Sequence, residues 1–404
     1  MNRREFIKTA AASSFARAAP HSGKFERSRS ALYEIGTYYF PNWHVDPLNE
    51  KTHGRGWTEW RLVQRAEPKF QGHQQPKVPE WGYENEADAA VFAKKIDAAA
   101  NHAINYFIFD WYWFNGKPFL NGALDHGYLG ATNRGRLKFC LMWANQNWVN
   151  LHPARLHMPY QTLFVESVDS AQFEAITTHI IAHYFSIPTY WKVDGAPYFS
   201  IYDLKSFLKG LGGINKAKRS LDRFREKVVM SGHSGLHVNA VDYGIHNAVW
   251  NDDMRAARNL VSQLGVDSVT SYTWIHNASF RGFPTTSYSH IYRQALAYWQ
   301  RAAHGYGVAY FPNVSMGWDS SPRGCQSDVY TLAKYPFLPI VIGNSPAEFR
   351  SALESVREEL DLQEMEPKIF NINAWNEWTE GSYLEPDTIH RFQYLEAIRK
   401  VFRA

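Results

Sequence analysis

Short apolar runs alternate with longer amphipathic stretches along most of the chain. Eight runs have the length and the β-branched and aromatic content of strands. They lie at 32–39, 104–110, 137–143, 197–202, 227–231, 267–272, 308–315 and 367–375. Helical spacing of apolar residues predicts helices at 86–101, 171–185, 215–226, 253–263, 285–302 and 345–360, and a last one at 388–402.

This alternation predicts a parallel sheet, and eight strands predict a single (β/α)8 TIM barrel. An open doubly wound sheet is the alternative, but the glycine-rich turn typical of that fold does not follow the first strand. The longest segments without helical spacing, 40–84 and 144–170, each follow a strand directly. Such loops gather on the C-terminal face of a barrel, so we expect the functional site there.

Residues 1–18 have the pattern of a twin-arginine signal peptide. Arg3 and Arg4 precede an apolar stretch, and small residues at 16 and 18 offer a cleavage site. A disordered basic tail is the alternative. We expect a mature barrel domain at 19–404, in the periplasm or secreted. Nothing after the leader approaches about 18 continuous apolar residues, so no transmembrane segment is predicted.

Aromatic residues make up 16% of the 404 residues, which is more than a core demands. This surplus indicates a cleft for a ring-shaped ligand, and an oligosaccharide or polysaccharide fits best. The net charge of +4 is too small for a nucleic-acid track, so no nucleic acid is expected as a partner. Cys140 and Cys325 permit one disulfide or two thiols, and no metal or other cofactor is predicted. The pattern leaves the oligomeric state open.

The strongest candidate chemistry lies at 371–386, NINAWNEWTEGSYLEP, where the last predicted strand ends. Glycoside cleavage needs one carboxyl group to protonate the leaving oxygen and a second as nucleophile or base. It also needs flat rings on which a sugar can lie. Glu377 and Glu380 stand among such rings, so we predict that both are catalytic. The alternative is a surface turn whose acids are solvated and whose tryptophans fill the core.

Polar and aromatic residues follow the other strands in the same manner, and we predict that they contact the substrate. After the first three strands these residues are Trp43, His44, Trp57, Glu59, Trp60, His73, Asp110, Trp111, Trp113, Lys117, Trp143, Asn145, Gln146 and Asn147. After the later strands they are Trp274, Trp318, Asp319, Arg323, Trp375, Asn376, Trp378 and Tyr383. Lys117 and Arg323 can hold a charged substituent, and the amides at 145–147 can alternatively orient core groups.

The motifs YYFPNWH, GWTEW, FQGHQQP, WYWFNGK, WANQNW, GWDSSPR and AWNEWTEGSYLEP, in this order, resemble the WbsX-like family, which is related to family 99 glycoside hydrolases. The resemblance covers residues 33 to 387. It implies a barrel that cleaves α-mannosidic bonds with retention. It also implies that Glu377 deprotonates the sugar 2-hydroxyl to form a 1,2-anhydro sugar, and that Glu380 protonates the leaving oxygen and later activates water. Family members often carry Glu where this chain has Gln146, which cannot ionise.

These observations favour an exported retaining α-glycosidase acting on a sugar of manno or rhamno configuration. A glycosyltransferase of surface-polysaccharide assembly is an alternative, although the D-x-D motif common in metal-dependent transferases does not occur in this sequence. A carbohydrate-binding protein without catalysis is another, for which the acid pair would be superfluous. Direct attack by a glutamate also stays open, because carboxyl separation cannot be read from sequence.

Overall fold

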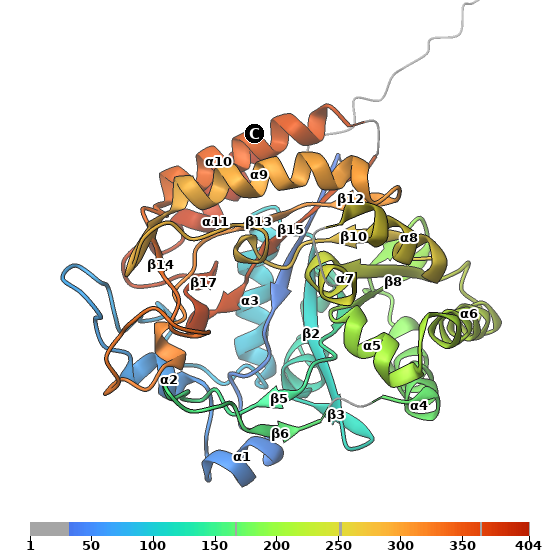
Figure 1. The fold of residues 1–404 in the computed structure, drawn as a ribbon, viewed down its shortest axis with the longest axis horizontal. Coiled ribbons are helices and arrows are strands. Elements are labelled where there is room, and N and C mark those ends of the chain that lie inside the picture. The colour runs from blue at the N-terminus through green and yellow to red at the C-terminus, as the bar shows by residue number, and fades with distance from the viewer. Residues whose placement is uncertain (1–31, 166–167, 250–252, 364–365, 404) are drawn as a thin grey trace, which may run out of the picture.

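The computed structural model describes residues 32–165, 168–249, 253–363 and 366–403, so the predicted leader lies outside the described residues. Parallel strands of one sheet wind around a common centre (Figure 1). They are β1 (Tyr33–Tyr39), β2 (Tyr106–Phe114), β4 (Lys138–Trp143), β8 (Ala196–Ile201), β9 (His237–Val241), β10 (Ser268–Thr270), β12 (Ala309–Phe311), β13 (Asn313–Ser315) and β15 (Lys368–Asn373).

The barrel closes at its seventh position, where Pro312 divides one strand into two pieces. β12 pairs with β10, whereas β13 pairs with β15, which pairs with β1. Proline has no amide hydrogen for the ladder, but the Pro312 carbonyl accepts a bond from the Asn371 amide at 2.9 Å. The predicted (β/α)8 barrel is confirmed, with the expected strand at 308–315 present as two segments.

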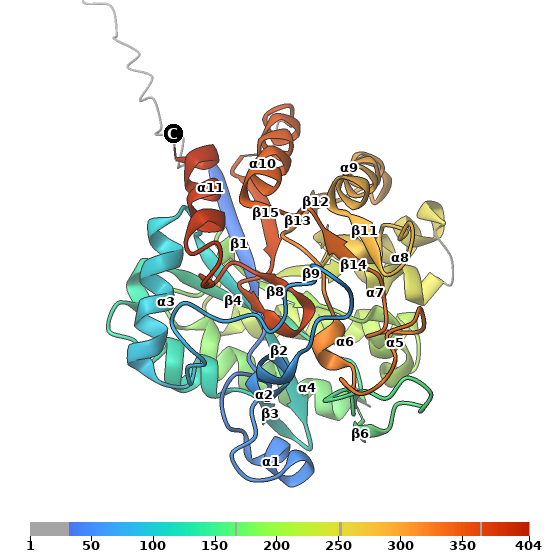
Figure 2. The same cartoon turned by 90° about the vertical axis from the view of Figure 1, so that its left-hand side faces the viewer.

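Helices surround the sheet (Figures 1 and 2). They are α3 (Ala89–Asn101), α4 (Ser170–Ile180), α5 (Leu204–Leu211), α6 (Ile214–Met230), α7 (Asp242–Val249), α8 (Met254–Leu264), α9 (Tyr288–Gly305), α10 (Pro346–Asp361) and α11 (Gln393–Phe402). The sequence missed α5 and α7, which have only eight residues each and so offer few periods of the apolar pattern. No helix in the described ranges combines the length and apolarity needed to cross a membrane.

One predicted strand is wrong. Residues 227–231 cover the end of α6, and the fifth barrel strand is β9. Phe224 and Val228 lie four residues apart on the buried face of α6, so the apolar run continues a helical stripe despite its β-branched residues. Gly232, with φ at +94°, then redirects the chain toward β9.

Three long loops follow barrel strands. The segment 40–84 contains the short helices α1 (Pro47–His53) and α2 (Trp60–Arg65), and 144–170 contains the paired strands β5 (Trp148–Val149) and β6 (Thr162–Phe164). The third, 316–345, was not predicted to be a long loop, although its GWDSSPR motif was identified from the sequence. A short hairpin also joins the end of β2 to β3 (Lys117–Phe119). Cys140 is buried in β4, and both Cys140 and Cys325 are free thiols.

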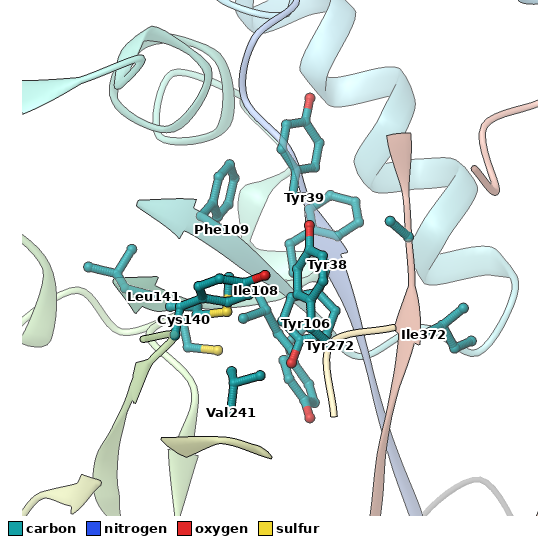
Figure 3. Packing of buried hydrophobic residues seen from close by; sticks show 14 of the residues in the cluster. Tyr38, Tyr39, Tyr106, Ile108, Phe109, Cys140, Leu141, Val241, Tyr272 and Ile372 are labelled. Atoms are coloured by element: carbon teal, nitrogen blue, oxygen red, sulfur yellow. The ribbon is translucent and has the colours of Figure 1, made fainter. Parts of the chain in front are cut away.

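Large aromatic side chains fill the barrel interior (Figure 3). The Tyr106 hydroxyl donates to Asn371 at 2.9 Å, and its ring stacks on Trp191 with 3.9 Å between centroids. Gly36 on β1 leaves room for this ring, since a Cβ added there would lie 2.3 Å from it. Glycine at position 36 therefore leaves the space that the Tyr106 ring occupies.

We expect Gly36→Ala to lower the free energy of unfolding by about 1–3 kcal/mol, because overpacking displaces the Tyr106 ring. Gly135→Ala is the matched control, since a Cβ at Gly135 meets no atom within 4 Å. Urea denaturation of both variants measures the difference. An unchanged midpoint for Gly36→Ala would contradict this packing.

Candidate active site

A cavity of about 570 Å³ lies at the carboxyl ends of the barrel strands. Residues that follow five of the strands form its base, namely Phe40, Ala144, Tyr202, Tyr272 and Glu377. The loops at 144–170 and 316–345 supply its walls, with Trp148 and Tyr160 on one and Trp318, Tyr335 and Leu338 on the other. Most of the lining is aromatic or aliphatic, so the cavity offers flat faces for a sugar ring.

The acid pair lies on a small hairpin that caps β15. Strands β16 (Asn376–Glu377) and β17 (Ser382–Tyr383) pair antiparallel around the 3-10 turn Trp378–Glu380. Gly381 adopts a left-handed conformation with φ at +63°, which lets the chain reverse there. The Asn376 amide group bonds both the amide and the carbonyl of Phe40, at 2.8 and 2.9 Å. The hairpin is thereby tied to the end of β1.

The indoles of Trp375 and Trp378 anchor the hairpin on its core side, opposite the cavity. Both donate to the buried carboxylate of Glu385, at 2.9 and 2.7 Å. Lys95 on α3 forms an ion pair with the same carboxylate at 2.7 Å. These tryptophans therefore support the acid pair from the core, while Glu377 and Glu380 line the cavity.

Arg323 joins three buried carboxylates at the cavity base. Its Nε lies 2.9 Å from Glu59, its Nη1 lies 2.5 Å from Glu380 and its Nη2 lies 3.3 Å from Glu377. Glu59 also accepts hydrogen bonds from Thr379 at 2.5 Å and from Asn42 at 2.6 Å. The ion pair with Glu59 thus fixes the orientation of the Arg323 guanidinium. The same guanidinium offsets part of the negative charge of the acid pair.

Burial raises the pKa of Glu377, and the charge of Glu380 adds to this while Arg323 opposes it. Burial likewise raises the pKa of Glu380, against the opposing effects of Arg323 and Tyr335. Burial would also raise the pKa of Glu59, but Arg323 and His152 outweigh it, and the result lies below the ordinary value. The surroundings of Glu59 therefore favour its ionised form, whereas burial favours the protonated form of each member of the acid pair.

Two tyrosine hydroxyls complete the polar floor. The Tyr335 hydroxyl donates to Oε1 of Glu380 at 2.7 Å, the same oxygen that accepts from Arg323. The Tyr272 hydroxyl lies 2.9 Å from Oδ2 of Asp110 and 3.2 Å from Oε1 of Glu377. Burial raises the pKa of Asp110 well above its ordinary value, although its bond from Tyr272 opposes the shift. The floor thus holds three carboxyl groups that can bind protons.

Comparison with known proteins identifies the family of this chain. Residues 35–398 match the family described as Glycosyltransferase WbsX. The chain belongs to this family. The WxcX protein of Xanthomonas campestris pv. campestris is 28% identical over 368 residues, which cover 90% of this chain and 48% of WxcX. This WbsX-family chain therefore spans about half the length of the curated relatives it matches.

Solved structures share the fold of this WbsX-family barrel. A family 99 endo-α-mannosidase from Bacteroides thetaiotaomicron has a TM-score of 0.50 at 15% identity and covers 91% of this chain and 96% of its own. A glycoside hydrolase-like protein has a TM-score of 0.57 at 16% identity, covering 92% of this chain and 94% of its own. These structures share the TIM-barrel fold of this chain, and the fold together with the family points to a carbohydrate-active enzyme.

The structure divides the predicted site residues of this WbsX-family chain into those at the cavity and those away from it. The cavity is lined by Asp110, Gln146, Asn147, Trp318, Arg323, Glu377 and Glu380. Glu59 lies behind Arg323. The following lie buried away from the cavity lining: Trp43, Trp57, Trp60, Trp111, Trp113, Trp143, Asn145, Trp274, Trp375, Asn376 and Trp378. Asn145 bonds the backbone of Asp203, as a core amide does.

The remaining predicted residues lie elsewhere. His44 pairs with the buried Glu86 at 3.0 Å, and Lys117 is exposed on β3. His73 pairs with Asp319 at 2.7 Å, and both line a second cavity of about 290 Å³ together with Tyr383. Arg323 could hold a charged substituent of a sugar only in competition with its three carboxylates.

Sequence reasoning missed several cavity residues, among them Tyr272, Tyr335 and His152. Tyr272 had a weak signal, because it is the last residue of the predicted strand 267–272 and stands two residues before Trp274. Tyr335 and His152 lie in long loops with no periodic pattern. Burial lowers the pKa of His152 to about 4, so its imidazole is neutral beside Glu59. Within the described ranges, no group of three or more His, Cys, Asp or Glu side chains forms a metal site.

Proposed function

We propose that this chain is a retaining α-glycosidase acting on an oligosaccharide or polysaccharide of manno or rhamno configuration. One observation carries the proposal: two buried carboxyl groups share one arginine at the base of an aromatic cavity. Similarity to the fold of a family 99 endo-α-mannosidase supports the same chemistry. A raised pKa suits a group that must donate a proton near neutral pH.

In the proposed reaction, Glu377 removes the proton of the sugar 2-hydroxyl, whose oxygen attacks the anomeric carbon as the glycosidic bond breaks. Glu380 donates a proton to the leaving oxygen, and the product is a 1,2-anhydro sugar. Water then opens this ring after giving its proton to Glu380, and Glu377 returns a proton to the 2-oxygen. Oε1 of Glu380 already accepts from Arg323 and Tyr335, which leaves Oε2 for the leaving oxygen.

A 2-fluoro substrate with an activated leaving group tests this route. Such a substrate lacks the internal nucleophile, so we expect it to inhibit without modifying the protein. Mass spectrometry of the peptide containing residues 371 to 386 measures the outcome. A covalent glycosyl adduct on this peptide would reject the anhydro route and make Glu377 a direct nucleophile.

A glycosyltransferase is the second candidate, because the family is described as Glycosyltransferase WbsX. The two functions differ in the acceptor, which is water for a hydrolase and a sugar hydroxyl for a transferase. Incubation with a glycan panel and with nucleotide sugars separates them. New reducing ends support hydrolysis, whereas release of nucleotide with a lengthened glycan supports transfer.

We also propose export through the arginine pair of the leader. The twin-arginine translocase reads Arg3 and Arg4 themselves rather than positive charge in general. We therefore expect the variant with lysine at both positions to remain in the cytoplasm. Cell fractionation of the two proteins measures this, and undiminished periplasmic delivery of the lysine variant would contradict it.

A further inference from the structure

Three buried groups form one hydrogen-bonded chain beside the acid pair. The hydroxyl of Tyr272 lies between Oδ2 of Asp110 at 2.9 Å and Oε1 of Glu377 at 3.2 Å. Tyr272 itself packs on Tyr38 with 4.6 Å between ring centroids, which fixes its hydroxyl in the barrel (Figure 3). A phenol has a single hydrogen to donate. The Tyr272 hydroxyl can therefore form well-aligned hydrogen bonds with both carboxyl oxygens only if one of the two carboxyl groups donates a hydrogen to it.

If the two carboxyl groups hold one proton between them, their surroundings decide which group carries it. Oε2 of Glu377 lies 3.3 Å from Nη2 of Arg323, so a negative charge there has a counter-charge. Oδ1 of Asp110 is buried and has no hydrogen-bond partner among the described residues. A carboxylate at that place would leave a buried charged oxygen unpaired, which is more costly than a neutral carboxylic acid.

We propose that Asp110 is a neutral carboxylic acid that acts through Tyr272 to keep Glu377 ionised. The hydrogen-bonded order is then Asp110 Oδ2–H to the Tyr272 oxygen, and Tyr272 O–H to Glu377 Oε1. Asp110 is a positioning residue, since it determines the protonation state of the base without contacting the reacting atoms. The inference rests on the proposed function only for the role of Glu377 as a base.

The same hydrogen-bonded chain keeps the transferred proton on Glu377. After Glu377 takes the hydrogen of the 2-hydroxyl, it could pass this hydrogen on to the Tyr272 oxygen only if Tyr272 passed its own hydrogen to Asp110. Asp110 could accept that hydrogen only if it were ionised. A neutral Asp110 blocks this path, so the proton stays on Glu377 for return to the 2-oxygen. Glu377 thus binds one proton in the first step and releases it in the second, and no further reactant is needed.

Other charged groups near this chain come from several elements and act on both ends. Glu380, Glu59 and Arg323 act on Glu377, with Arg323 opposing the two acids. Glu380 and Arg323 also act on Asp110. Because both carboxyl groups are buried and their pKa values are raised, the pair loses its last proton only well above the ordinary range of carboxylic acids.

Carboxyl titration tests the proposal without any need for activity. We would label the carboxyl carbons of Asp and Glu with carbon-13 in the full chain and assign the two signals with Asp110→Asn and Glu377→Gln. At neutral pH we expect the Asp110 carboxyl to be protonated and the Glu377 carboxyl to be ionised. An ionised Asp110 beside a protonated Glu377 would overturn the proposal, as would two ionised groups.

Tyr272→Phe tests the same chain at its middle. Loss of the hydroxyl removes one hydrogen bond to ionised Glu377, so the Glu377 signal should titrate about one pH unit higher, the equivalent of one hydrogen bond. Tyr112→Phe is the control, because Tyr112 lines the same cavity and no described hydrogen bond joins its hydroxyl to either carboxyl. Equal Glu377 titration in both variants would overturn the proposal.

A pH profile separates this inference from the proposed function. If the protein is a glycosidase, the acidic limb of kcat/KM should move upward in Tyr272→Phe and stay in place in Tyr112→Phe. A change in KM alone would assign Tyr272 to substrate binding and overturn the proposal that Asp110 acts on Glu377 through Tyr272. If no glycan is cleaved or transferred, the proposed function is rejected, while the carboxyl titration still decides where the proton lies.

Discussion

Replacing Arg323 by methionine should remove about 3–5 kcal/mol from the free energy of unfolding at neutral pH and abolish catalysis. The reason is that Arg323 pairs with Glu59, Glu377 and Glu380 inside the cavity floor, so its loss leaves these buried carboxyl groups without a counter-charge. Methionine has a similar length and avoids a large void. Urea denaturation with activity assays measures both effects.

The pH dependence identifies the cause of that loss. In the native protein Arg323 opposes the effect of burial on the pKa of each of the three carboxyl groups, so these pKa values should rise when Arg323 is replaced. The deficit relative to the native protein should therefore be largest at neutral pH and shrink as the pH falls and the carboxyl groups bind protons. Arg350→Met is the control, since its exposed pair with Glu354 should contribute at most about 1 kcal/mol. Equal losses in the two variants would contradict the buried network.

Glu380→Gln should lower the rate of cleavage by about 10²–10⁴-fold for sugars with poor leaving groups, the range contributed by a general acid. Glutamine keeps the shape and can still accept from Arg323 and Tyr335 through its carbonyl oxygen. Substrate binding, measured by calorimetry, should change little. Activated aryl glycosides should lose much less activity, because their leaving groups depart without a proton.

Glu348→Gln provides a matched control for this prediction. Glu348 lies in the exposed first turn of α10, away from the cavity lining, so its substitution should leave both substrate types unaffected. An equal loss on aryl glycosides and natural glycans in Glu380→Gln would argue against its role as the acid. Loss of binding in that variant would point instead to a structural effect on Arg323.

The sequence by itself determined the class of fold, because strand and helix periods are local properties. Helices of ten or more residues and most strands were predicted within a few residues, since each repeats its apolar pattern several times. The exception at 227–231 shows the limit of this reasoning. A short run containing Val228 and Val229 fits either period, and only packing of the preceding turns on the barrel makes it helical.

The acid pair was also visible in the sequence, because Glu377 and Glu380 lie three residues apart on one hairpin. The pairings that control these two acids were not visible there, although Glu59 and Arg323 were among the predicted site residues. Arg323 pairs with Glu59 across 264 positions, and Tyr272 reaches Glu377 across 105. Only the closed barrel brings the ends of β1, β10, β13 and β15 together, so those pairings are a property of the tertiary structure.

Tertiary structure also decided which aromatic side chains line the cavity. Trp375 and Trp378 stand beside the acid pair in the sequence, yet their indoles point to Glu385 in the core. Tyr272 and Tyr335, which were not among the predicted site residues, line the cavity instead. The direction of a side chain on an irregular loop depends on the hydrogen bonds and packing of distant segments. A local pattern therefore identifies the chemistry that a site can use, and the closed fold decides which residues carry it.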